Sequence, residues 1–375
     1  MAEQLLALIF RMVYTFFVVA FILVTQVIAF VKNPKLFWQR KRREIPTALA
    51  TPDCGQHGFY YGRRLRIHYV ANGEKGKPLM LFIHGYPQFW YCWRHQLKEF
   101  GKDYYAVAVD NRGYGDTGRP THMEDYDIKE LIEDVKDIIV GLGYEKCTLV
   151  AHDWGGFIAW HFAHFHPEYL EKLIIMNAPH PRPVRPCVIM LMLYEFAAPA
   201  RLTDDIFLKN CIIYLVRIFK QYMETHITQA LKSWYIFFYQ IPYLPEFVES
   251  SSDYELIDII MTSVIHSDPK TKDIFTKDDE ECYKYNLSRP SCLTSAINYY
   301  RQNVFIPPLP FKYDKITAPT LIIWGEKDDA LNKELNNGIA KYVDSVILKY
   351  MAEGTHWISE QFPEETNKHM RDFLQ

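Results

Sequence analysis

The sequence predicts an α/β fold: a mostly parallel, doubly wound sheet with a helical cap insertion and an N-terminal transmembrane helix. Three observations lead to this fold class. Short apolar runs alternate with helical stretches in both halves of the chain, which is the pattern of parallel strands joined by crossover helices. The alternation is interrupted over 180–305, a region rich in aromatic residues and helical in character. A long apolar segment opens the chain.

The segment 1–32 predicts a membrane anchor. Between Leu5 and Val31 the only charged residue is Arg11, and this run exceeds the roughly 20 residues that cross a bilayer. A secretory signal peptide is the competing interpretation, but the run is too long and no clear small-residue cleavage site follows it. We therefore expect a single-pass membrane protein that contacts lipid through this helix.

The flanks of the apolar run predict its orientation. Almost no basic residue precedes it, and a basic cluster follows it: Lys32, Lys35, Arg40, Lys41, Arg42 and Arg43. The positive-inside rule directs the catalytic domain to the cytoplasm, with the endoplasmic reticulum as the expected membrane. The sequon that begins at Asn286 would be used only in a lumen, but such triplets are frequent by chance. Residues 33–56 are polar, contain proline and predict a linker.

The composition narrows the class of protein. Of 375 residues, 49% are hydrophobic and 15% aromatic, which supports a large folded core and argues against disorder. The formal net charge is −3 and no basic patch is visible, so nucleic acid is not an expected partner. The seven cysteines are scattered and match neither a disulfide framework nor a zinc motif. We expect no metal and no other cofactor.

The first part of the core is predicted over 57–179. It opens with an apparent hairpin, in which Gly58–Tyr61 and Leu65–Val70 flank a turn at Gly62. Continuous apolar runs then predict buried parallel strands. These strands are Pro78–Ile83, Ala106–Val109, Thr148–Ala151 and Leu173–Asn177, with helices around Trp93–Phe100 and over Ile128–Leu142.

The alternation resumes after the insertion, and 306–375 is predicted as the second part of the core. Strands are expected at Thr320–Trp324 and Val346–Leu348, with a helix around Lys333–Tyr342 and a last helix from Pro363. The insertion 180–305 is then a helical cap between two parts of one sheet. Because ligands of open α/β sheets bind at the carboxyl ends of the strands, the cap would roof the functional site.

Asp153 occupies the tip of a predicted sharp turn. It follows an apolar run and precedes a helical stretch, with Ala151 and Gly155 two positions to either side, and small residues at that spacing mark a nucleophile elbow. A carboxylate with an ordinary pKa of roughly 3.9 is charged at neutral pH and can displace at an sp³ carbon to form an alkyl ester. Asp153 thus predicts transfer of an alkyl group to water, from an epoxide or an alkyl halide. The structural alternative is a helix N-cap.

Two further residues complete a set in the chain order nucleophile, acid, histidine. Asp328 follows the predicted strand that ends at Trp324, and His356 follows the last predicted strand. His356 would activate water against the Asp153 ester. Asp328 would orient the imidazole, with Asp329 as a near-equal candidate for that role.

The string His84-Gly85-Tyr86-Pro87 follows another predicted strand. The backbone N–H groups of Tyr86 and Trp154 are candidates for an oxyanion hole on the ester carbonyl. His84, Pro87 and Trp154 are expected to contact the substrate. The structural alternative for His84 and Gly85 is a simple turn between a strand and a helix.

Together these motifs resemble those of the epoxide hydrolases of the α/β-hydrolase superfamily. The resemblance covers about 57–375, and it rests on four strings: His84-Gly85-Tyr86-Pro87, Ala151–Gly156 with Asp153, Gly325-Glu326-Lys327-Asp328 and Gly354-Thr355-His356-Trp357. Tyr86 stands where the family often has Phe. With the N-terminal anchor, the chain is similar to the membrane-bound epoxide hydrolases of types 3 and 4. Haloalkane and fluoroacetate dehalogenases share the elbow and the triad.

The resemblance implies two cap tyrosines that hydrogen-bond the epoxide oxygen. The first lies just upstream of the string Tyr239-Gln240-Ile241-Pro242 and matches Tyr235, and the second lies in Tyr299-Tyr300-Arg301 and matches Tyr300. A phenol can protonate the alkoxide that ring opening creates, whereas a halide needs no proton. Tyr239 and Tyr299 are the alternative assignments, because the chain has 26 tyrosines and most must serve packing or the surface.

The implied reaction converts a small lipophilic epoxide, such as an epoxide of an unsaturated fatty acid, into a vicinal diol. Water is the second substrate, and no cofactor takes part. Two alternatives stay open at the level of sequence. One is a haloalkane or haloacid dehalogenase, which would use the same nucleophile, and the other is a catalytically silent scaffold with the same fold.

Overall fold

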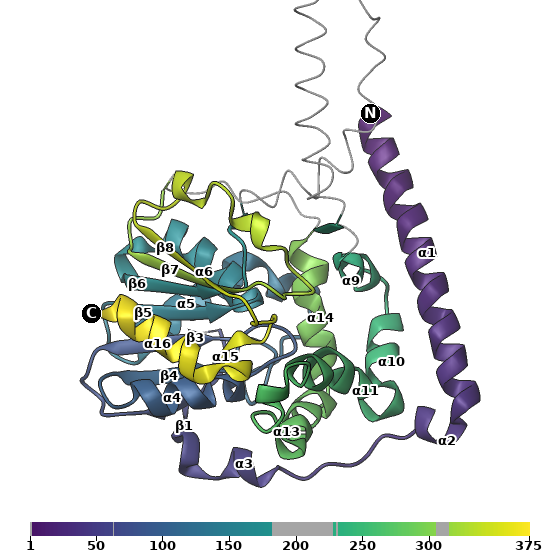
Figure 1. The fold of residues 1–375 in the computed structure, drawn as a ribbon, viewed down its shortest axis with the longest axis horizontal. Helices are drawn as coiled ribbons and strands as arrows, with labels where there is room; N and C mark the ends of the chain where they lie inside the picture. Colours follow the sequence, from purple (N-terminus) through teal and green to yellow (C-terminus); the bar gives the residue numbers. More distant parts are fainter. Residues whose placement is uncertain (1, 63, 182–227, 230–231, 305–314) are drawn as a thin grey trace, which may run out of the picture.

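The computed structural model of the chain describes residues 2–62, 64–181, 228–229, 232–304 and 315–375. Within these residues eight strands form one sheet: β1 (Gln56–Tyr61), β2 (Arg66–Asn72), β3 (Leu79–Ile83), β4 (Tyr105–Val109), β5 (Cys147–His152), β6 (Leu170–Met176), β7 (Thr320–Gly325) and β8 (Val346–Met351). The spatial order is β1-β2-β4-β3-β5-β6-β7-β8 (Figure 1). Strand β2 runs antiparallel to β1 and β4, and the other neighbours are parallel. The predicted fold class is confirmed.

The burial of the strands matches the apolar runs in their sequences. Strands β3, β4, β5 and β7 are buried along their whole length, as expected for apolar runs whose sheet is covered on both faces. The edge strand β1 mixes exposed and half-buried residues. Each strand predicted from the sequence is present, with ends that differ by a few residues.

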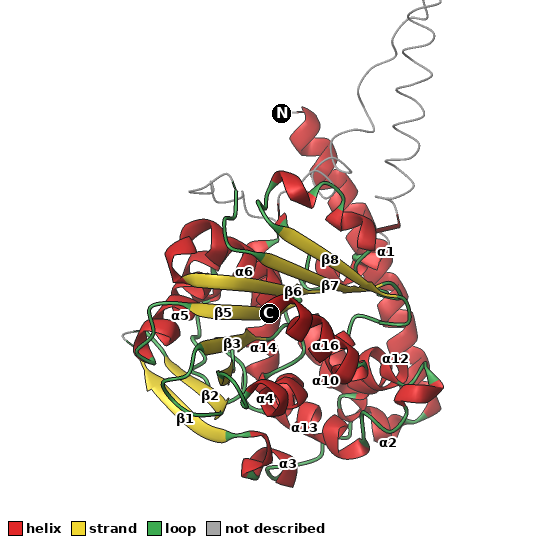
Figure 2. Ribbon diagram, turned by 60° about the vertical axis from the view of Figure 1, so that its left-hand side comes forward, coloured by secondary structure: helices red, strands yellow, loops and turns green. Residues whose placement is uncertain are grey.

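Helices cover both faces of the sheet (Figure 2). Helices α4 (Arg94–Phe100) and α16 (Pro363–Leu374) pack together on one face, and α5 (Ile128–Gly141) and α6 (Trp154–Phe165) pack together on the other. The shorter helical turns of the core are η2 (Trp90–Trp93), η3 (Met123–Tyr126), η4 (Pro167–Tyr169) and α15 (Ile358–Gln361). Helix α5 illustrates the amphipathic pattern: Asp127 caps its N-terminus, and its buried residues recur three and four positions apart.

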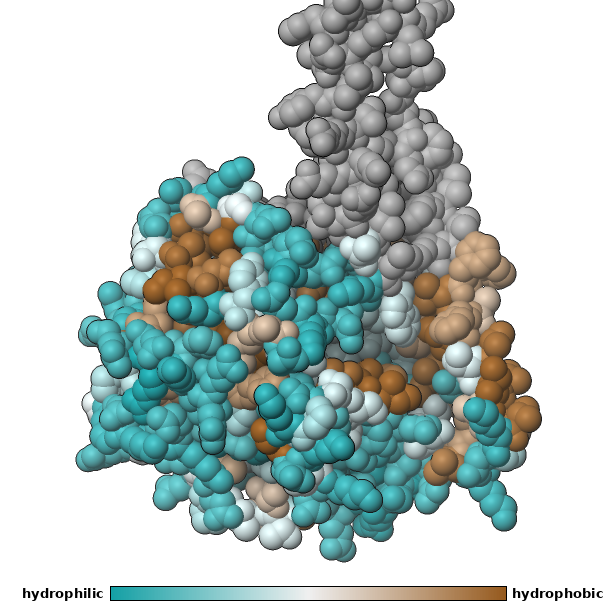
Figure 3. Space-filling model, viewed as in Figure 1, coloured by the Kyte–Doolittle hydropathy of each residue, from teal (hydrophilic) through white to brown (hydrophobic). Residues whose placement is uncertain are grey.

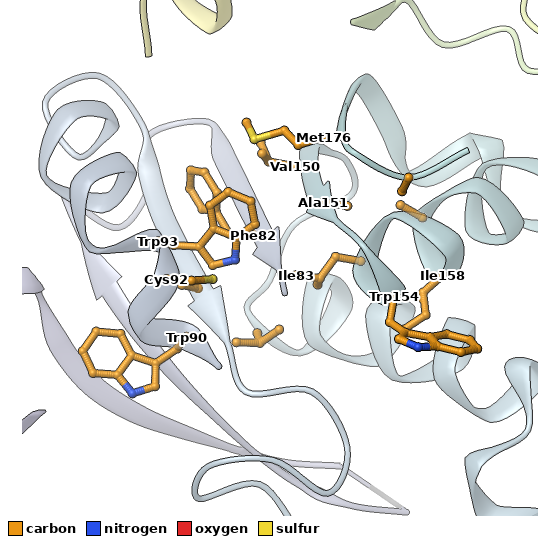
Figure 4. Packing of buried hydrophobic residues seen from close by; sticks show 14 of the residues in the cluster. Phe82, Ile83, Trp90, Cys92, Trp93, Val150, Ala151, Trp154, Ile158 and Met176 are labelled. Atoms are coloured by element: carbon orange, nitrogen blue, oxygen red, sulfur yellow. The ribbon is translucent and has the colours of Figure 1, made fainter. Parts of the chain in front are cut away.

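The hydrophobic core lies between the sheet and these helices. Figure 4 shows Phe82 and Ile83 of β3 and Val150 of β5 with Met176 of β6 nearby, and Ile158 of α6 on the other side. Each of these side chains is at most 2% exposed. The core therefore fixes the carboxyl ends of the central strands, where the candidate site residues lie.

The helix predicted around Lys333–Tyr342 is wrong. The structure has two separate 3₁₀ turns there, η9 (Lys333–Asn336) and η10 (Ile339–Lys341). Asn337 adopts an extended backbone, and Gly338 has a φ of 78°. A left-handed residue after an extended one ends a helix, because the i to i−4 hydrogen bonds cannot continue through it.

The described part of the cap is helical and lies beside the carboxyl edge of the sheet (Figure 1). Its elements are α9 (Trp234–Phe238), α10 (Leu244–Ser250), η6 (Ser251–Asp253), α11 (Glu255–Ile257), η7 (Asp258–Thr262), α12 (Ser263–Ile265), η8 (Pro269–Thr271), α13 (Lys277–Ser288) and α14 (Cys292–Asn303). Much of the predicted cap, 182–227 and 230–231, lies outside the described residues.

The segment predicted as a linker, 33–56, contains short helical turns and packs on the cap. These turns are α2 (Pro34–Phe37), α3 (Thr47–Ala50) and η1 (Pro52–Cys54). Arg43 donates hydrogen bonds of 2.9 and 2.8 Å to the two carboxylate oxygens of Asp253 and one of 3.0 Å to Glu281. A bidentate Arg–carboxylate pair fixes orientation as well as contact, so this segment is held to the cap.

The N-terminal helix α1 (Ala2–Lys32) is long and apolar enough to cross a membrane, with a mean hydropathy of 2.2 over Thr15–Lys32. Phe16, Phe17 and Phe21 are each more than 60% exposed, and Figure 3 shows apolar side chains along this helix. The helix packs against α9 and α2. An exposed apolar helix of this length fits a single-pass membrane anchor.

Candidate active site

Asp153 lies at the turn between β5 and α6, with a φ of 50° and a ψ of −121°. The turn is closely packed: a Cβ atom at Gly85 would lie 2.3 Å from Asp153 Oδ1, and one at Gly155 would lie 2.4 Å from the carbonyl oxygen of Ile83. Only glycine fits at both positions, because such distances are far below van der Waals contact. This is the geometry of a nucleophile elbow.

The Tyr86 backbone N–H donates a hydrogen bond of 2.8 Å to Asp153 Oδ1. Trp154 supplies the first N–H of helix α6, directly after Asp153, and the first amides of a helix have no acceptor within it. The peptide bond between Tyr86 and Pro87 is cis. Oδ1 thus accepts from the Tyr86 backbone, while Oδ2 faces His356.

That partner is His356. Its Nε2 lies 3.5 Å from Asp153 Oδ2, and its Nδ1 lies 2.8 Å from Asp328 Oδ2. Asp329 is exposed and Asp328 is 3% exposed, so Asp328 is the acid that contacts His356. The loop after β8 and the loop after β7 bring these two side chains to the same edge of the sheet.

Asp328 is held by donors on both carboxylate oxygens. Oδ1 accepts from the N–H groups of Ala330 and Leu331 at 2.8 Å each, and Oδ2 accepts from Asn177 Nδ2 at 2.7 Å. Burial raises the pKa of Asp328, but the charge of His356 and these hydrogen bonds outweigh it, so the pKa lies below its ordinary value. Asp328 therefore stays ionised at neutral pH.

The resting site holds a proton on His356 between two carboxylates. Burial lowers the pKa of His356, but the charge of Asp328 and its contacts with both carboxylates outweigh burial and raise it to about 10. The pKa of Asp153 is raised by burial and lowered more strongly by His356, so it ends below its ordinary value. Asp153 is thus ionised at neutral pH, and His356 is an imidazolium.

His152 contacts the backbone and the ring of His356. Its Nε2 donates a hydrogen bond of 2.8 Å to the backbone carbonyl of His356, and its Nδ1 lies 2.7 Å from Gln88 Oε1. The ring centroids of the two histidines are 4.7 Å apart. Burial lowers the pKa of His152 to about 4. No sequence motif indicated this role, because His152 lies at the end of β5, directly before Asp153.

His84 is fully buried. Its Nε2 accepts the Asn111 backbone N–H at 3.0 Å, so its Nδ1 carries the proton that it donates to the Gly85 carbonyl at 2.9 Å. Burial lowers the pKa of His84 to about 4. We assign His84 to holding the loop that carries the Tyr86 N–H, in place of the substrate contact expected from the sequence. Pro87 is also buried.

The two cap tyrosines lie above the elbow. Tyr235 comes from α9 and Tyr300 from α14, and their ring centroids are 5.9 Å apart. Tyr300 packs edge-on against the indole of Trp154, at 4.9 Å. Burial and the charge of Asp153 raise the pKa of both phenols above the ordinary value. Both therefore keep their proton at neutral pH and can donate it.

The alternative tyrosines occupy other positions. The Tyr299 hydroxyl donates to the backbone carbonyl of Arg112 at 2.7 Å, so it is engaged with the core. Tyr239 lies beside Tyr300, with 4.6 Å between ring centroids. Glu249 of α10, which no sequence motif marked, accepts a hydrogen bond from the Tyr86 hydroxyl. It places a buried carboxyl next to this group of phenols.

No three His, Cys, Asp or Glu side chains come together as metal ligands would within the described ranges. The set Asp153, His356 and Asp328 with backbone donors and cap phenols can form and hydrolyse an ester on a carboxylate. Asn177 is a third residue, besides His152 and Glu249, that sequence reasoning missed. The available signal was its place directly after β6, at the same sheet edge as Asp153 and Asp328.

Comparisons with known proteins identify the family of the chain. The chain matches the family model of the alpha/beta hydrolase fold over residues 78–363. It is 39% identical to epoxide hydrolase 4 of Homo sapiens over 347 residues, which are 92% of this chain and 86% of that protein. It is 36% identical to epoxide hydrolase 3 of Xenopus tropicalis, covering 89% and 82% of the two chains.

Among solved structures, the chain resembles an epoxide hydrolase from Bacillus megaterium in complex with an inhibitor. The TM-score is 0.68 at 30% sequence identity, and the match covers 84% of this chain and 99% of that chain. The similarity therefore extends over most of this chain.

Proposed function

Because the chain belongs to the α/β-hydrolase fold family and, within it, to the epoxide hydrolases, we propose that it converts small lipophilic epoxides into vicinal diols through an ester on Asp153. The observation that carries the proposal is the environment of the Asp153 carboxylate. One oxygen accepts the Tyr86 N–H at 2.8 Å, and the other lies 3.5 Å from His356 Nε2. The cap phenols Tyr235 and Tyr300 lie above this carboxylate.

In the first step Asp153 attacks an epoxide carbon. Oδ1 is bound by the Tyr86 N–H, so Oδ2 forms the new C–O bond and Oδ1 becomes the carbonyl oxygen of the ester. The carbon–oxygen bond of the ring breaks, and its electron pair goes to the epoxide oxygen. Tyr235 and Tyr300 donate hydrogen bonds to that oxygen and supply the proton that turns the alkoxide into a hydroxyl group.

Ester formation changes the charge next to His356. Asp153 is one of the two carboxylates that raise the pKa of His356, and an ester carries no negative charge. Once Asp153 is alkylated, the pKa of His356 falls and its proton restores the cap phenol that protonated the epoxide oxygen. The neutral imidazole is then a general base, still oriented by Asp328 through a 2.8 Å hydrogen bond.

In the second step His356 takes a proton from water, whose oxygen attacks the ester carbonyl. The tetrahedral oxyanion forms on Oδ1, where the N–H groups of Tyr86 and Trp154 stabilise it. The acyl carbon–oxygen bond breaks, the diol leaves with a proton, and Asp153 and His356 return to their ionised pair. The sum of the two steps is addition of one water to one epoxide.

The substrate class and the location of the enzyme belong to the same proposal. The apolar helix α1 and the aromatic cap favour lipophilic epoxides, including epoxides of unsaturated fatty acids. The basic flank after α1 favours a single-pass protein of the endoplasmic reticulum with its catalytic domain in the cytoplasm. Asn286 of the sequon is 1% exposed and accepts the Gly115 N–H at 3.0 Å, so a glycan there is incompatible with this packing.

Single turnover in oxygen-18 water tests the ester route. With enzyme in excess over epoxide, the first diol should contain almost no label, because its new oxygen comes from the Asp153 carboxylate. Over repeated turnovers the label should appear in the Asp153 carboxylate, read by mass spectrometry of the peptide. Label that enters the first diol directly would exclude the ester. Halide release from chloroalkanes without epoxide hydration would favour a dehalogenase.

A further inference from the structure

Glu249 is a buried carboxyl that the catalytic steps leave unexplained. It is 4% exposed and lies on α10 in the cap. Its Oε2 accepts a hydrogen bond from the hydroxyl of Tyr86, which belongs to the core loop after β3. A buried carboxyl is costly to keep unless hydrogen bonds or protonation offset its desolvation, so this contact between the cap and the core requires an explanation.

Tyr86 connects Glu249 to the nucleophile. Its backbone N–H binds Asp153 Oδ1 at 2.8 Å while its side-chain hydroxyl binds Glu249. Its ring packs edge-on against Tyr300 and Tyr239, with 5.6 Å between centroids in both pairs. A single residue thus joins the oxyanion donor, the phenols of the cap and the Glu249 carboxyl.

The groups that face Glu249 come from every element around it. Besides the Tyr86 hydroxyl, they are Tyr239 from the end of α9, Tyr114 from the loop after β4, and Glu246 from α10 itself, which is paired with Arg301 of α14 at 2.6 Å. Burial raises the pKa of Glu249 to about 7, against the hydrogen bonds from Tyr239 and Tyr86, which lower it.

The other ionisable groups of the site titrate away from neutral pH. The pKa values of Asp153 and Asp328 lie below their ordinary range, that of His356 is about 10, and that of His152 is about 4. Ionisation of Glu249 would place a negative charge beside the hydroxyl of Tyr86 and beside Tyr239, whose ring centroid lies 4.6 Å from that of Tyr300. A nearby negative charge disfavours the phenolate and makes each phenol a weaker proton donor.

Building on the proposed function, we propose that Glu249 is a positioning residue for ester formation. Through Tyr86 it ties the cap to the donor that binds Asp153, and in its neutral form it leaves the cap phenols able to protonate the opening epoxide. Ionised Glu249 keeps the contact but weakens the proton donors. The rate of ester formation then depends on a carboxyl that touches neither the nucleophile nor the substrate.

The test measures ester formation in the full-length enzyme as a function of pH. Styrene oxide at a saturating concentration, in excess over the enzyme, is mixed with it, the reaction is quenched on the millisecond scale, and the formation of the Asp153 ester is followed by mass spectrometry. In the wild type, ester formation should slow by about tenfold as pH rises through neutrality. In Glu249→Gln, which keeps an acceptor but cannot ionise, the rate should be the same on both sides of pH 7.

A second variant separates this role from folding. Tyr86→Phe keeps the backbone N–H but removes a hydrogen bond that lowers the pKa of Glu249. The pKa of Glu249 should then rise, and the fall in the rate of ester formation should move to higher pH. Tyr91→Phe is the matched control: its hydroxyl donates to the buried Asp279 at 2.9 Å, also between the core and the cap. That control should keep the wild-type profile. Infrared spectra should show a protonated carboxyl band at pH 6 that is absent from Glu249→Gln.

The possible outcomes are distinct. A neutral-pH decline that persists in Glu249→Gln, or an unmoved decline in Tyr86→Phe, would overturn the inference. If Glu249→Gln does not fold, the direction of the shift in Tyr86→Phe decides alone. A wild-type rate that is flat around pH 7 also overturns this inference while leaving the ester route intact. Absence of any Asp153 ester at every pH would instead refute the proposed function.

Discussion

Asn177 Nδ2 donates a hydrogen bond of 2.7 Å to Asp328 Oδ2, the same oxygen that accepts from His356 Nδ1 at 2.8 Å. Asn177 has a φ of 42° and is fully buried directly after β6. Its amide therefore fixes the acid from a position that few side chains can adopt. This contact links the first part of the core to the loop that carries Asp328.

Replacing Asn177 should slow ester hydrolysis more than ester formation. Asn177→Gly tolerates the positive φ but loses the donor to Asp328, so we expect hydrolysis of the Asp153 ester to slow by about tenfold and unfolding to cost about 1–2 kcal/mol less. Single-turnover rates of ester formation and ester hydrolysis measure the first effect, and thermal unfolding measures the loss of stability. Asn177→Ala should be less stable than Asn177→Gly, because alanine is strained at this φ. Equal loss in both steps would contradict a role through Asp328.

His356→Gln should trap the covalent intermediate. Asp153 keeps its charge and its Tyr86 donor, so the ester should still form, while its hydrolysis should slow by about 10²–10⁴-fold without the general base. The intact mass of the protein should rise by the mass of the epoxide. Asp153→Ala provides the control and should show no adduct. An adduct of the same mass in Asp153→Ala would place the nucleophile elsewhere.

The cap phenols should act on ester formation. Tyr235→Phe and Tyr300→Phe should each lower its rate by about 10–100-fold, with a larger loss in the double variant, because the alkoxide loses its proton donors. Tyr299→Phe is the matched comparison, since its hydroxyl donates to the Arg112 carbonyl. It should cost about 1 kcal/mol of stability and leave ester formation unchanged. The reverse pattern would reassign the second tyrosine to Tyr299.

Stability should depend on pH through His356. Its pKa is about 6.5 when unperturbed and about 10 in the folded protein, so the folded state holds the proton more tightly. This contribution is fully present below about pH 6.5 and is lost as pH rises through 10. The difference in unfolding free energy between wild type and His356→Gln, measured by urea unfolding, should shrink over this range. A difference that grows with pH would contradict a proton shared between two carboxylates.

Much of the fold followed from the sequence because its strands are continuous apolar runs. β3, β5 and β7 are buried on both faces, so hydrophobicity alone marks them. The residues that follow such strands share one sheet edge, which is why Asp153, Asp328 and His356 could be selected before any coordinates. The helix expected around Lys333–Tyr342 was wrong, because a local pattern does not report the left-handed backbone at Gly338.

The parts of the site that the sequence did not predict depend on packing between distant segments. The choice between Asp328 and Asp329 needed the direction of each side chain, and only Asp328 points inward. Glu249 and Tyr86 meet across 163 positions, and no spacing rule connects a cap helix to a core loop. His84 was expected at the substrate, but its ring nitrogens are taken by backbone groups.

The imidazolium held between Asp153 and Asp328 has a consequence for unwanted chemistry. An empty site contains no free base, so water inside it is not activated, and foreign carboxylic esters that diffuse in should survive. In the proposed mechanism, only an alkyl group on Asp153 lowers the pKa of His356 and frees the base, next to the ester that this base hydrolyses. In that mechanism the substrate itself creates the capacity of the site to hydrolyse an ester, and this capacity is lost when the product leaves.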